Sequence, residues 1–541
     1  MHFSAKKVIA LCLALCLLLT GCAGIDLKGY FENLTSALSG VTDFSNMEYS
    51  RPNMDALQSA LDLLCTQAAT ETDVEALTAK IWEFYGIYDS FSTNYALALI
   101  HYYQDLRSSY WEEEYNFCLE NAPQADAALD TLYRALANSP LRAQLESDEY
   151  FGAGYFDYYE GESLYDDTLM SLLEEESQIL SRYYTVSGKA SDAELYSDAY
   201  YDRYGSALTE IFLELIRVRQ KMAAHLGYAD YSQFAYDFYY YRDYTPQQAA
   251  AYLADIRAEL APLYQQHLQS DFWDTEIGYS SEEETFSYVS SMAQNMGGSI
   301  EEAFDTLQKG KLYDISYGEN KYNASFETYL PSYYVPFIFV NPSMTSFDRL
   351  AFAHEFGHFC SDYLSYGSVA GVDVAEVFSQ GMEYLSLCYA EGGESLKALK
   401  LADCLCLYVE QAALASFEQQ VYNLSGDELT AENVQSLYTD ICQAYGLVNQ
   451  DWDNRSYVTV THYFTNPMYI ISYVVSNDAA LQLYQLELES TGTGLACLES
   501  NLTTYQGWFL AFMEEAGLTS PFAPGRIADV KQFLHNALLG S

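Results

Sequence analysis

The sequence predicts a mainly α fold in which a small sheet lies beside one helix that carries two histidines. Apolar residues recur at helical spacing in segment after segment between about residue 50 and residue 310. The apolar, aromatic-rich run 336–341 is bounded by prolines, as expected of a short strand. No linker rich in Pro, Gly or Ser and no internal repeat follows residue 50. We therefore expect one large helical protein with lobes instead of three or four domains.

The first 24 residues form a targeting segment. Lys6 and Lys7 precede the apolar run 8–19, which is the layout of a secretory signal. The end of the run, Leu19-Thr20-Gly21-Cys22, resembles the lipobox of bacterial lipoproteins, whose cysteine is lipid-modified. An uncleaved transmembrane helix is the alternative, but the run is too short to span a bilayer comfortably. We expect Cys22 to anchor the protein by lipid on the extracytoplasmic face of a bacterial cell membrane.

Composition narrows the possible partners. The formal net charge of -51 comes from 76 acidic and 25 basic residues. This charge disfavours nucleic acid or an anionic membrane surface as a partner, and we interpret it as a solvated acidic coat more readily than as a field that steers substrates. Eight of the 11 cysteines lie after Cys22 and form no C-x-x-C pair, which favours buried thiols over a second metal site.

Helices are predicted along most of the chain after residue 50. Apolar residues at helical spacing define each of them. The predicted ranges are 54–64, 74–85, 95–106, 127–136, 169–184, 207–226, 246–268, 409–424 and 430–445.

The most informative stretch is His354-Glu355-Phe356-Gly357-His358. Two histidines four residues apart project from one face of a helix, so their imidazoles can converge on one zinc ion. Glu355 points to the side and can act on a water molecule as a base. The run 345–348 has the form of a capping box, so the helix should begin just before the motif and end near Gly367.

The strand before this helix suggests a place for a substrate. We predict that strand 336–341 lies at a sheet edge, because Pro336 cannot donate to a neighbouring strand. An extended peptide could pair with such an edge, and we assign substrate binding to Phe339 and Asn341.

A catalytic zinc site needs a third protein ligand. Asp362 lies eight residues beyond His354, about 12 Å along the helix, which is too far. Glu376 and Glu383 share one side of a largely apolar helical run, 373–385, where carboxylates are costly unless they are paired or bound to a metal. We assign Glu376 as the ligand and Glu383 as a group that orients the ligands or bridges helices.

These residues resemble the zinc site of the thimet oligopeptidase and oligoendopeptidase F family of metallopeptidases. The motif followed by Glu376-x-x-Ser379-x-x-x-Glu383 carries the resemblance, which extends upstream to Asp348 and to Asn323-Ala324, where the family usually has Gly-Ala. By this resemblance we place Asp348, with Glu383, next to the ligands.

The resemblance is incomplete. Ser361 stands where the family commonly has a further histidine, and the spacer before Glu376 is several residues short. Neither departure changes a predicted zinc ligand, so both concern the subfamily and the cleavage specificity and not zinc binding. The resemblance covers roughly residues 200–535, and residues 25–200 match only in being helical. We therefore expect a helical lobe over 25–200 and the catalytic region over 201–541.

The stretch 461–473 resembles a family segment whose histidine and tyrosines donate hydrogen bonds to the substrate oxyanion. The resemblance implies this role for His462 and Tyr473, and a substrate contact for Tyr469, which adjoins Ile470 where the family has a second tyrosine. A packed aromatic helix with a loop histidine is the alternative. For the whole chain, the resemblance implies a zincin-type peptidase with a deep cleft between helical lobes.

The expected activity is hydrolysis of short, unfolded peptides by a monomeric zinc endopeptidase with one Zn²⁺ ion. An angiotensin-converting-type dipeptidyl carboxypeptidase is the enzyme alternative. Other zinc peptidase classes fit less well, since residue 364 is Leu and not a third histidine. A surface lipoprotein that only binds peptides is the non-enzyme alternative, and the presence of both motif histidines, Glu355 and Glu376 disfavours it.

Overall fold

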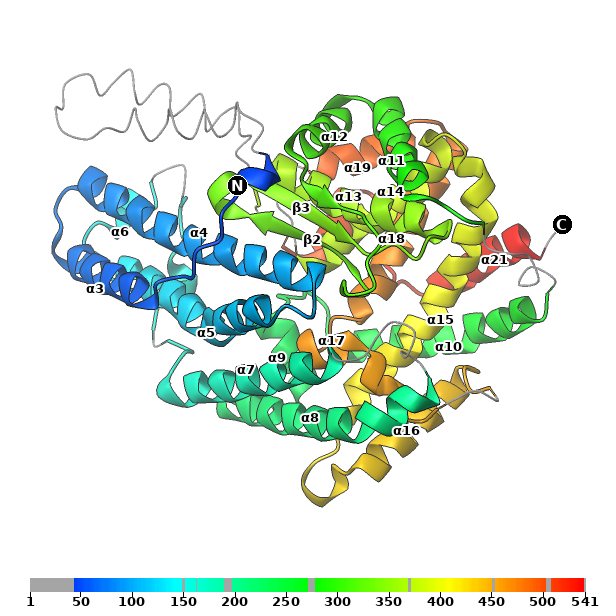
Figure 1. Cartoon of the computed structure of the whole chain (residues 1–541), viewed down its shortest axis with the longest axis horizontal. Coiled ribbons are helices and arrows are strands. Elements are labelled where there is room, and N and C mark those ends of the chain that lie inside the picture. The colour runs from blue at the N-terminus through cyan, green and yellow to red at the C-terminus, as the bar shows by residue number, and fades with distance from the viewer. Residues whose placement is uncertain are drawn as a thin grey trace.

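The computed structural model has the mainly α fold that the sequence predicts, with a small sheet beside the helix that carries the two histidines. Figure 1 shows the N-terminal helices on the left, the sheet with that helix at the upper centre, and the C-terminal end of the chain on the right. The structure describes residues 43–147, 151–161, 163–188, 197–270, 278–367, 371–449, 453–502 and 507–539.

The N-terminal half is a succession of helices. Polar residues cap most of them: Asn53, for example, accepts a hydrogen bond from the Ala56 N–H at the start of the first long helix. The helices are α3 (Met54–Thr70), α4 (Val74–Gln104), α5 (Ser109–Ala137), α6 (Arg142–Leu145), α7 (Asp167–Ser187), α8 (Asp198–His225), α9 (Tyr231–Phe238) and α10 (Pro246–Leu268).

Several predicted boundaries are wrong in this half. Helix α3 continues to Thr70 instead of ending at 64, and α8 begins at Asp198 instead of 207. The separate helices 74–85 and 95–106 are one helix, α4, which runs through Gly86. Helix α5 begins at Ser109, well before the predicted start at residue 127, and it continues through Pro123. Tertiary packing along these helices outweighs the local effect of one glycine or one proline, so periodicity located both helices but not their ends.

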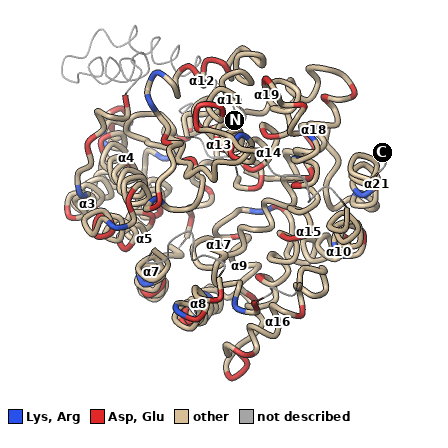
Figure 2. The backbone as a smooth tube through the Cα atoms, turned by 45° about the vertical axis from the view of Figure 1, so that its right-hand side comes forward, with Lys and Arg blue, Asp and Glu red and all other residues tan. Residues whose placement is uncertain are grey.

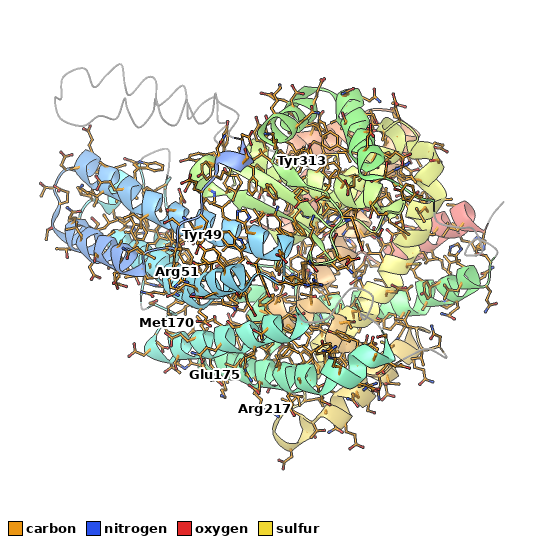
Figure 3. All side chains as sticks on the ribbon, in the orientation of Figure 1. Tyr49, Arg51, Met170, Glu175, Arg217 and Tyr313 are labelled. Carbon is orange, nitrogen blue, oxygen red and sulfur yellow. The ribbon has the colours of Figure 1, made fainter. Side chains whose placement is uncertain are left out.

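The apolar interior has two parts. A smaller cluster lies among α3–α6 and includes Leu57, Phe84 and Leu132, whereas the larger cluster extends from the middle of α4 to the C-terminus. The segment before α3 is tied to α5, because Tyr49 and Arg51 both bond the carboxylate of Glu114. Figure 3 labels Tyr49 and Arg51.

The sheet has three strands in the order β1-β3-β2, with β1 at Tyr313–Asp314, β2 at Ser325–Leu330 and β3 at Val335–Val340. The predicted strand is therefore central, and its placement at an edge is wrong. Strand β1 runs parallel to β3 and reaches only Ile338 and Phe339, while β2 is antiparallel to β3 along its whole length. Pro336 lies beyond the reach of β1, so its missing N–H costs no ladder hydrogen bond.

The helices after the sheet build the rest of the main core. Helix α13 packs against β2, β3 and α14, and α14 packs in turn against α18. The bounds in this half are α11 (Glu282–Met296), α12 (Gly298–Gly310), α13 (Phe347–Ser365), α14 (Val372–Tyr389), α15 (Lys397–Val421), α16 (Ala431–Ala444), α17 (Thr461–Thr465), α18 (Ile471–Glu489), α19 (Thr493–Leu502), α20 (Phe509–Glu515) and α21 (Arg526–Leu538).

Acidic residues are spread over most of the helices, and Lys and Arg are sparse between them (Figure 2). This distribution fits the predicted acidic coat better than a single acidic patch. No helix among the described residues is both long enough and apolar enough to cross a membrane. Cys22 and the segment 1–24 lie outside the described residues.

Candidate metal centre and active site

Helix α13 presents both motif histidines from one face. It begins at Phe347, as predicted, and ends at Ser365, next to the predicted Gly367. The capping box is only half formed, because the Asp348 carboxylate accepts from the Thr345 N–H but no side chain caps the first turn. Asp348 also accepts from the N–H of Ser343. It therefore fixes the turn before α13 and does not contact a predicted ligand.

Gly357 allows α14 to lie unusually close to α13. A Cβ atom at this position would lie 2.6 Å from both the Phe378 carbonyl oxygen and the Ser379 Cα. Only glycine leaves room for the two helices to approach this closely. The approach brings Glu376 opposite the two histidines.

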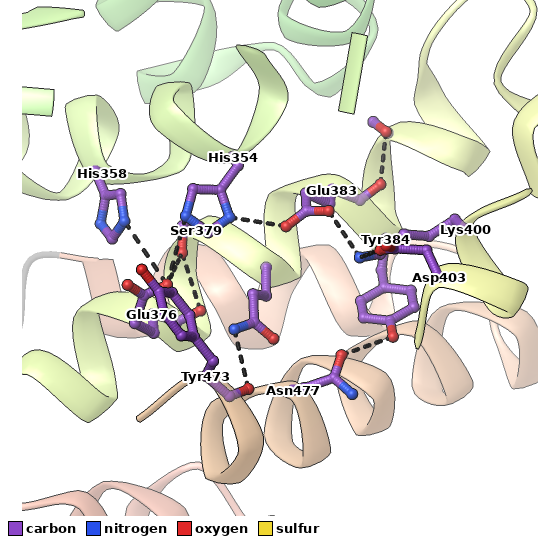
Figure 4. A network of polar contacts seen from close by, with 12 residues as sticks. His354, His358, Glu376, Ser379, Glu383, Tyr384, Lys400, Asp403, Tyr473 and Asn477 are labelled. Carbon is purple, nitrogen blue, oxygen red and sulfur yellow. Dashed lines mark hydrogen bonds and ion pairs between the residues drawn. The ribbon is translucent and has the colours of Figure 1, made fainter. Parts of the chain in front are cut away.

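The three predicted ligands come together (Figure 4). One ligand atom from each of His354, His358 and Glu376 lies within 4.8 Å of the other two. Glu376 Oε2 is 3.4 Å from His354 Nε2 and 3.9 Å from His358 Nε2. Among the described residues, this is the one group of three or more His, Cys, Asp or Glu side chains that could hold a metal ion.

The group fits a zinc ion by chemistry and spacing. Two imidazoles and one carboxylate form a usual donor set of catalytic zinc sites. Four tetrahedral ligands at about 2.0–2.2 Å from zinc lie about 3.3–3.6 Å from one another, close to the separations found here. The side chains of His354 and His358 keep 19 % and 17 % exposure, so solvent reaches the group from one side.

A buried chain of charges orients His354. Glu383 Oε1 lies 2.8 Å from His354 Nδ1, which leaves Nε2 directed towards Glu376. The other Glu383 oxygen lies 2.7 Å from the ammonium of Lys400, which is completely buried on α15. Burial opposes ionisation of Glu383, but Lys400 and the hydrogen bond to His354 lower its pKa below the ordinary value. Burial likewise opposes charge on His354, but the surrounding carboxylates raise its pKa to about 9.

Two hydroxyl groups hold the Glu376 carboxylate. Ser379 Oγ donates to Oε2 at 3.0 Å, and the Tyr469 hydroxyl donates to Oε1 at 2.6 Å. Tyr469, which we predicted to contact substrate, is thus bonded to the predicted ligand. Burial raises the pKa of Glu376, and these hydrogen bonds act in the opposite direction.

Glu355 is a buried carboxyl group beside the three ligands. It is 6 % exposed and has no hydrogen-bonding partner within the described part of the chain. Burial raises its pKa to about 7, although the neighbouring His354 works against the shift. A carboxyl group with this pKa can take up and release a proton near neutral pH.

Three aromatic side chains complete the site. The rings of His462, Tyr469 and Tyr473 lie between 5.1 and 5.5 Å from one another, and the Tyr473 hydroxyl is 3.1 Å from His462 Nε2. Figure 4 shows Tyr473 reaching from α18 towards Glu376. Burial lowers the pKa of His462 to about 4, so its ring is neutral at pH 7.

Two predicted substrate contacts do not reach the surface. The Phe339 side chain is completely buried, and Asn341 is 8 % exposed. Asn341 bonds the backbone of Gly318 and Lys321 instead. These residues stabilise the sheet, and the expectation that a peptide pairs with β3 is wrong because both sides of β3 are occupied.

Sequence reasoning missed the buried cations around the site. Lys400 lies in the apolar helix α15, and Arg242 bonds Asp373 at the start of α14. A lysine within an apolar run of a lysine-poor protein is a signal that could have revealed Lys400. Nothing local in the sequence pairs Arg242 with Asp373, since 131 residues separate them.

The fold and the site define a class: a large helical protein of zincin type. Its two motif histidines lie on one helix, and a glutamate comes from the next. The comparisons with known proteins are consistent with this class. The profile of the Peptidase M3 N-terminal domain matches residues 44–163. This match lies within residues 25–200, for which the sequence patterns predict only helices.

Solved structures share the fold over almost the whole chain. A PZ peptidase A with a bound inhibitor has a TM-score of 0.82 at 19% identity, covering 92% of this chain and 99% of that one. A Bacillus anthracis protein assigned as an oligoendopeptidase F has a TM-score of 0.78 at 21% identity, covering 92% and 98%. An oligoendopeptidase F from Enterococcus faecium is more distant, with a TM-score of 0.52 at 13% identity, covering 90% and 98%. No curated protein matches the sequence.

Proposed function

We propose that this protein is a zinc-dependent endopeptidase that hydrolyses short, unfolded peptides. The observation that carries the proposal is the convergence of His354, His358 and Glu376 beside the buried carboxyl group of Glu355. The match to a peptidase N-terminal domain and the fold shared with oligoendopeptidases support it. We further propose that the protein binds one zinc ion and acts as a monomer.

Each group has a chemical role in this proposal. A zinc ion held by the two histidines and Glu376 would polarise a carbonyl group and lower the pKa of water. Glu355 removes a proton from the attacking water and transfers it to the leaving amine. His462 and Tyr473 donate hydrogen bonds to the carbonyl oxygen as negative charge develops on it, an effect worth about 3–4 kcal/mol for one donor in well-studied hydrolases.

The outer edge of β2 is the place we propose for the peptide backbone. Strand β2 pairs with β3 on one side, and no described strand pairs with the other. It packs against α13, so a peptide along this edge would lie next to the helix that carries the histidines. The proposed cleft between helical lobes would admit such an extended chain but not a folded protein.

The test is digestion of a mixed peptide library, read by mass spectrometry, with the wild-type ectodomain and with Glu355→Gln. We expect the wild type to cleave, a chelator to abolish cleavage, and the Gln variant to lose about 10²–10⁴-fold in kcat while it still binds zinc. Glu410→Gln, at an exposed position on α15, is the control for loss of a carboxylate elsewhere and should cleave normally. Chelator-resistant cleavage, or full activity of the Glu355 variant, would contradict the mechanism.

We also propose that the protein is lipid-anchored at the outer face of a bacterial membrane. The support is the leader with Lys6 and Lys7, the apolar run 8–19 and Cys22. A labelled fatty acid should be incorporated into the wild type, and Cys22→Ser should lose the label and retain its leader. A Cys22→Ser product that is still labelled would refute the anchor.

A further inference from the structure

The segment 461–473 carries all three aromatic groups of the site, but its local structure is not stable by itself. Helix α17 has only five residues, too few to be stable alone. Met468 has a φ angle of 69°, a left-handed conformation that is costly for a residue other than glycine, typically by about 1–3 kcal/mol. Contacts from elsewhere in the chain must therefore hold His462, Tyr469 and Tyr473 in place.

Arg219 on α8 holds the first part of the segment. Its side chain is completely buried, and its guanidinium donates to the carbonyl oxygens of Tyr463 and Phe464, the latter through a short contact. These carbonyls directly follow His462 and belong to the last turn of α17, where carbonyl groups have no partner within the helix. The same guanidinium bonds Glu176 on α7 at 2.6 Å, which fixes it between two long helices.

Arg242, in the turn between α9 and α10, holds the second part. Its guanidinium donates to the carbonyl oxygen of Met468 at 2.8 Å and to the Ser472 hydroxyl at 2.8 Å. Two further donors bond the Asp373 carboxylate at 3.1 and 3.2 Å. The left-handed residue before Tyr469 is thus tied to the first turn of α14, the helix that carries Glu376.

The surroundings of Arg242 leave it little freedom. The rings of Tyr236, Tyr240 and Tyr244 lie 4.3, 4.4 and 5.7 Å from the guanidinium carbon. The Tyr240 hydroxyl donates to the Pro467 carbonyl, one residue before Met468. A planar guanidinium that makes four directed hydrogen bonds cannot be replaced by the point charge of lysine without loss of geometry.

We propose that Arg219 and Arg242 are positioning residues that hold segment 461–473 against the metal centre. Arg219 acts through His462, and Arg242 acts through Tyr469 and Tyr473. For catalysis, this inference rests on the proposed peptidase function. The structural claim, that the two guanidinium groups order this segment, does not depend on that function.

The test compares Arg219→Lys and Arg242→Lys with Arg526→Lys. Arg526 is a matched control, since it is 8 % exposed and bonds both oxygens of Asp478 on α18 but contacts no residue of segment 461–473. Thermal unfolding is measured for all three variants, and each should remain folded. Hydrogen exchange of the amides in 461–473 should accelerate at least about tenfold in the first two variants and stay unchanged in the control.

Kinetics provide the second readout. We expect Arg219→Lys and Arg242→Lys to lower kcat by about 10–100-fold with one zinc ion still bound, because displacement of catalytic groups by about 1 Å is that costly. In a protein that already carries His462→Ala, Arg219→Lys should lower kcat by less than about threefold. In a protein that already carries Tyr473→Phe, Arg242→Lys should likewise lower kcat by less than about threefold. Arg526→Lys should keep the wild-type kcat.

Three results would overturn the inference. Unchanged exchange of 461–473 in both variants would refute the structural claim. The catalytic claim would be refuted if Arg526→Lys lowered kcat as much as the other two variants. It would also be refuted if the effects of the two substitutions in each double variant multiplied as independent effects do. If the wild-type protein hydrolyses no peptide, the proposed function fails, and hydrogen exchange still decides whether the arginines order the segment.

Discussion

Gly357→Ala is expected to damage the metal centre without touching a ligand. The new methyl group would lie 2.6 Å from two backbone atoms of α14, the Phe378 oxygen and the Ser379 Cα. Ordinary contact begins at about 3.4 Å, so one helix must move by about 0.8 Å. A backbone cannot rotate away as a long side chain can.

Two opposing effects set the size of the change. Alanine stabilises a helix by about 1 kcal/mol relative to glycine. Overpacking a close helix contact costs about 1–3 kcal/mol. The net loss of stability is therefore modest, about 0–2 kcal/mol. The effect on zinc should be larger, because ligand distances tolerate only about 0.2 Å and a shifted α14 carries Glu376 with it. We expect zinc affinity to fall by about 10–100-fold.

Gly86→Ala is the matched control. Gly86 also lies within a helix, α4, and a Cβ atom there would meet no atom within 4 Å. This variant should gain up to about 1 kcal/mol and bind zinc normally. Competition with a fluorescent chelator measures zinc affinity, and thermal unfolding with and without zinc measures stability. If Gly357→Ala binds zinc as tightly as Gly86→Ala, the argument that helix spacing builds the site is refuted.

Three further predictions concern the surrounding residues. Lys400→Met should weaken zinc binding by about 10–100-fold, because Glu383 loses its cation and orients His354 less firmly. Lys321→Met, which removes a buried ion pair at the sheet, is the control. It should lower stability in thermal unfolding, but chelator competition should find its zinc affinity unchanged. Tyr473→Phe should lower kcat about 10²-fold with little change in KM, as steady-state kinetics would measure. Burial raises the pKa of Glu418 to about 8, so the folded state holds a proton between pH 4.5 and 8 that the unfolded chain releases. Stability should therefore fall as pH rises through this window, by up to about 5 kcal/mol, and urea unfolding should find Glu418→Gln less pH-dependent.

Each of these predictions has a contradicting result. Zinc binding that is equally weak in both lysine variants would show that Lys400 acts through stability alone. A Tyr473→Phe enzyme with a raised KM and normal kcat would assign the hydroxyl to substrate binding. A Glu418→Gln variant whose stability follows pH as steeply as the wild type would show that another group titrates.

Local patterns in the sequence locate most helices and predict the convergence of His354, His358 and Glu376. Apolar periodicity located the helix from Pro246 to Leu268 at its observed bounds. Helical geometry puts His354 and His358 on one face of α13, and α14, the next helix in the chain, packs closely enough to bring Glu376 to them.

Features that depend on distant packing could not be predicted in this way. The central position of β3 is set by β1, whose two residues carry no recognisable strand pattern. Arg242 meets Ser472 across 230 residues, and Lys400 reaches Glu383 from a separate helix. The partner of a buried cation is chosen by tertiary packing, which periodicity and motif spacing do not report.

The edge of β2 with which no described strand pairs has a consequence for concentrated protein solutions. A strand edge that can accept a foreign peptide can also accept the same strand from a second molecule, which is how sheet proteins begin to aggregate. The net charge of -51 makes two copies repel each other at low ionic strength, and salt screens this repulsion. Concentrated stocks should therefore stay dispersed best in dilute buffer, and a tight-binding peptide along the edge should protect them when salt is added.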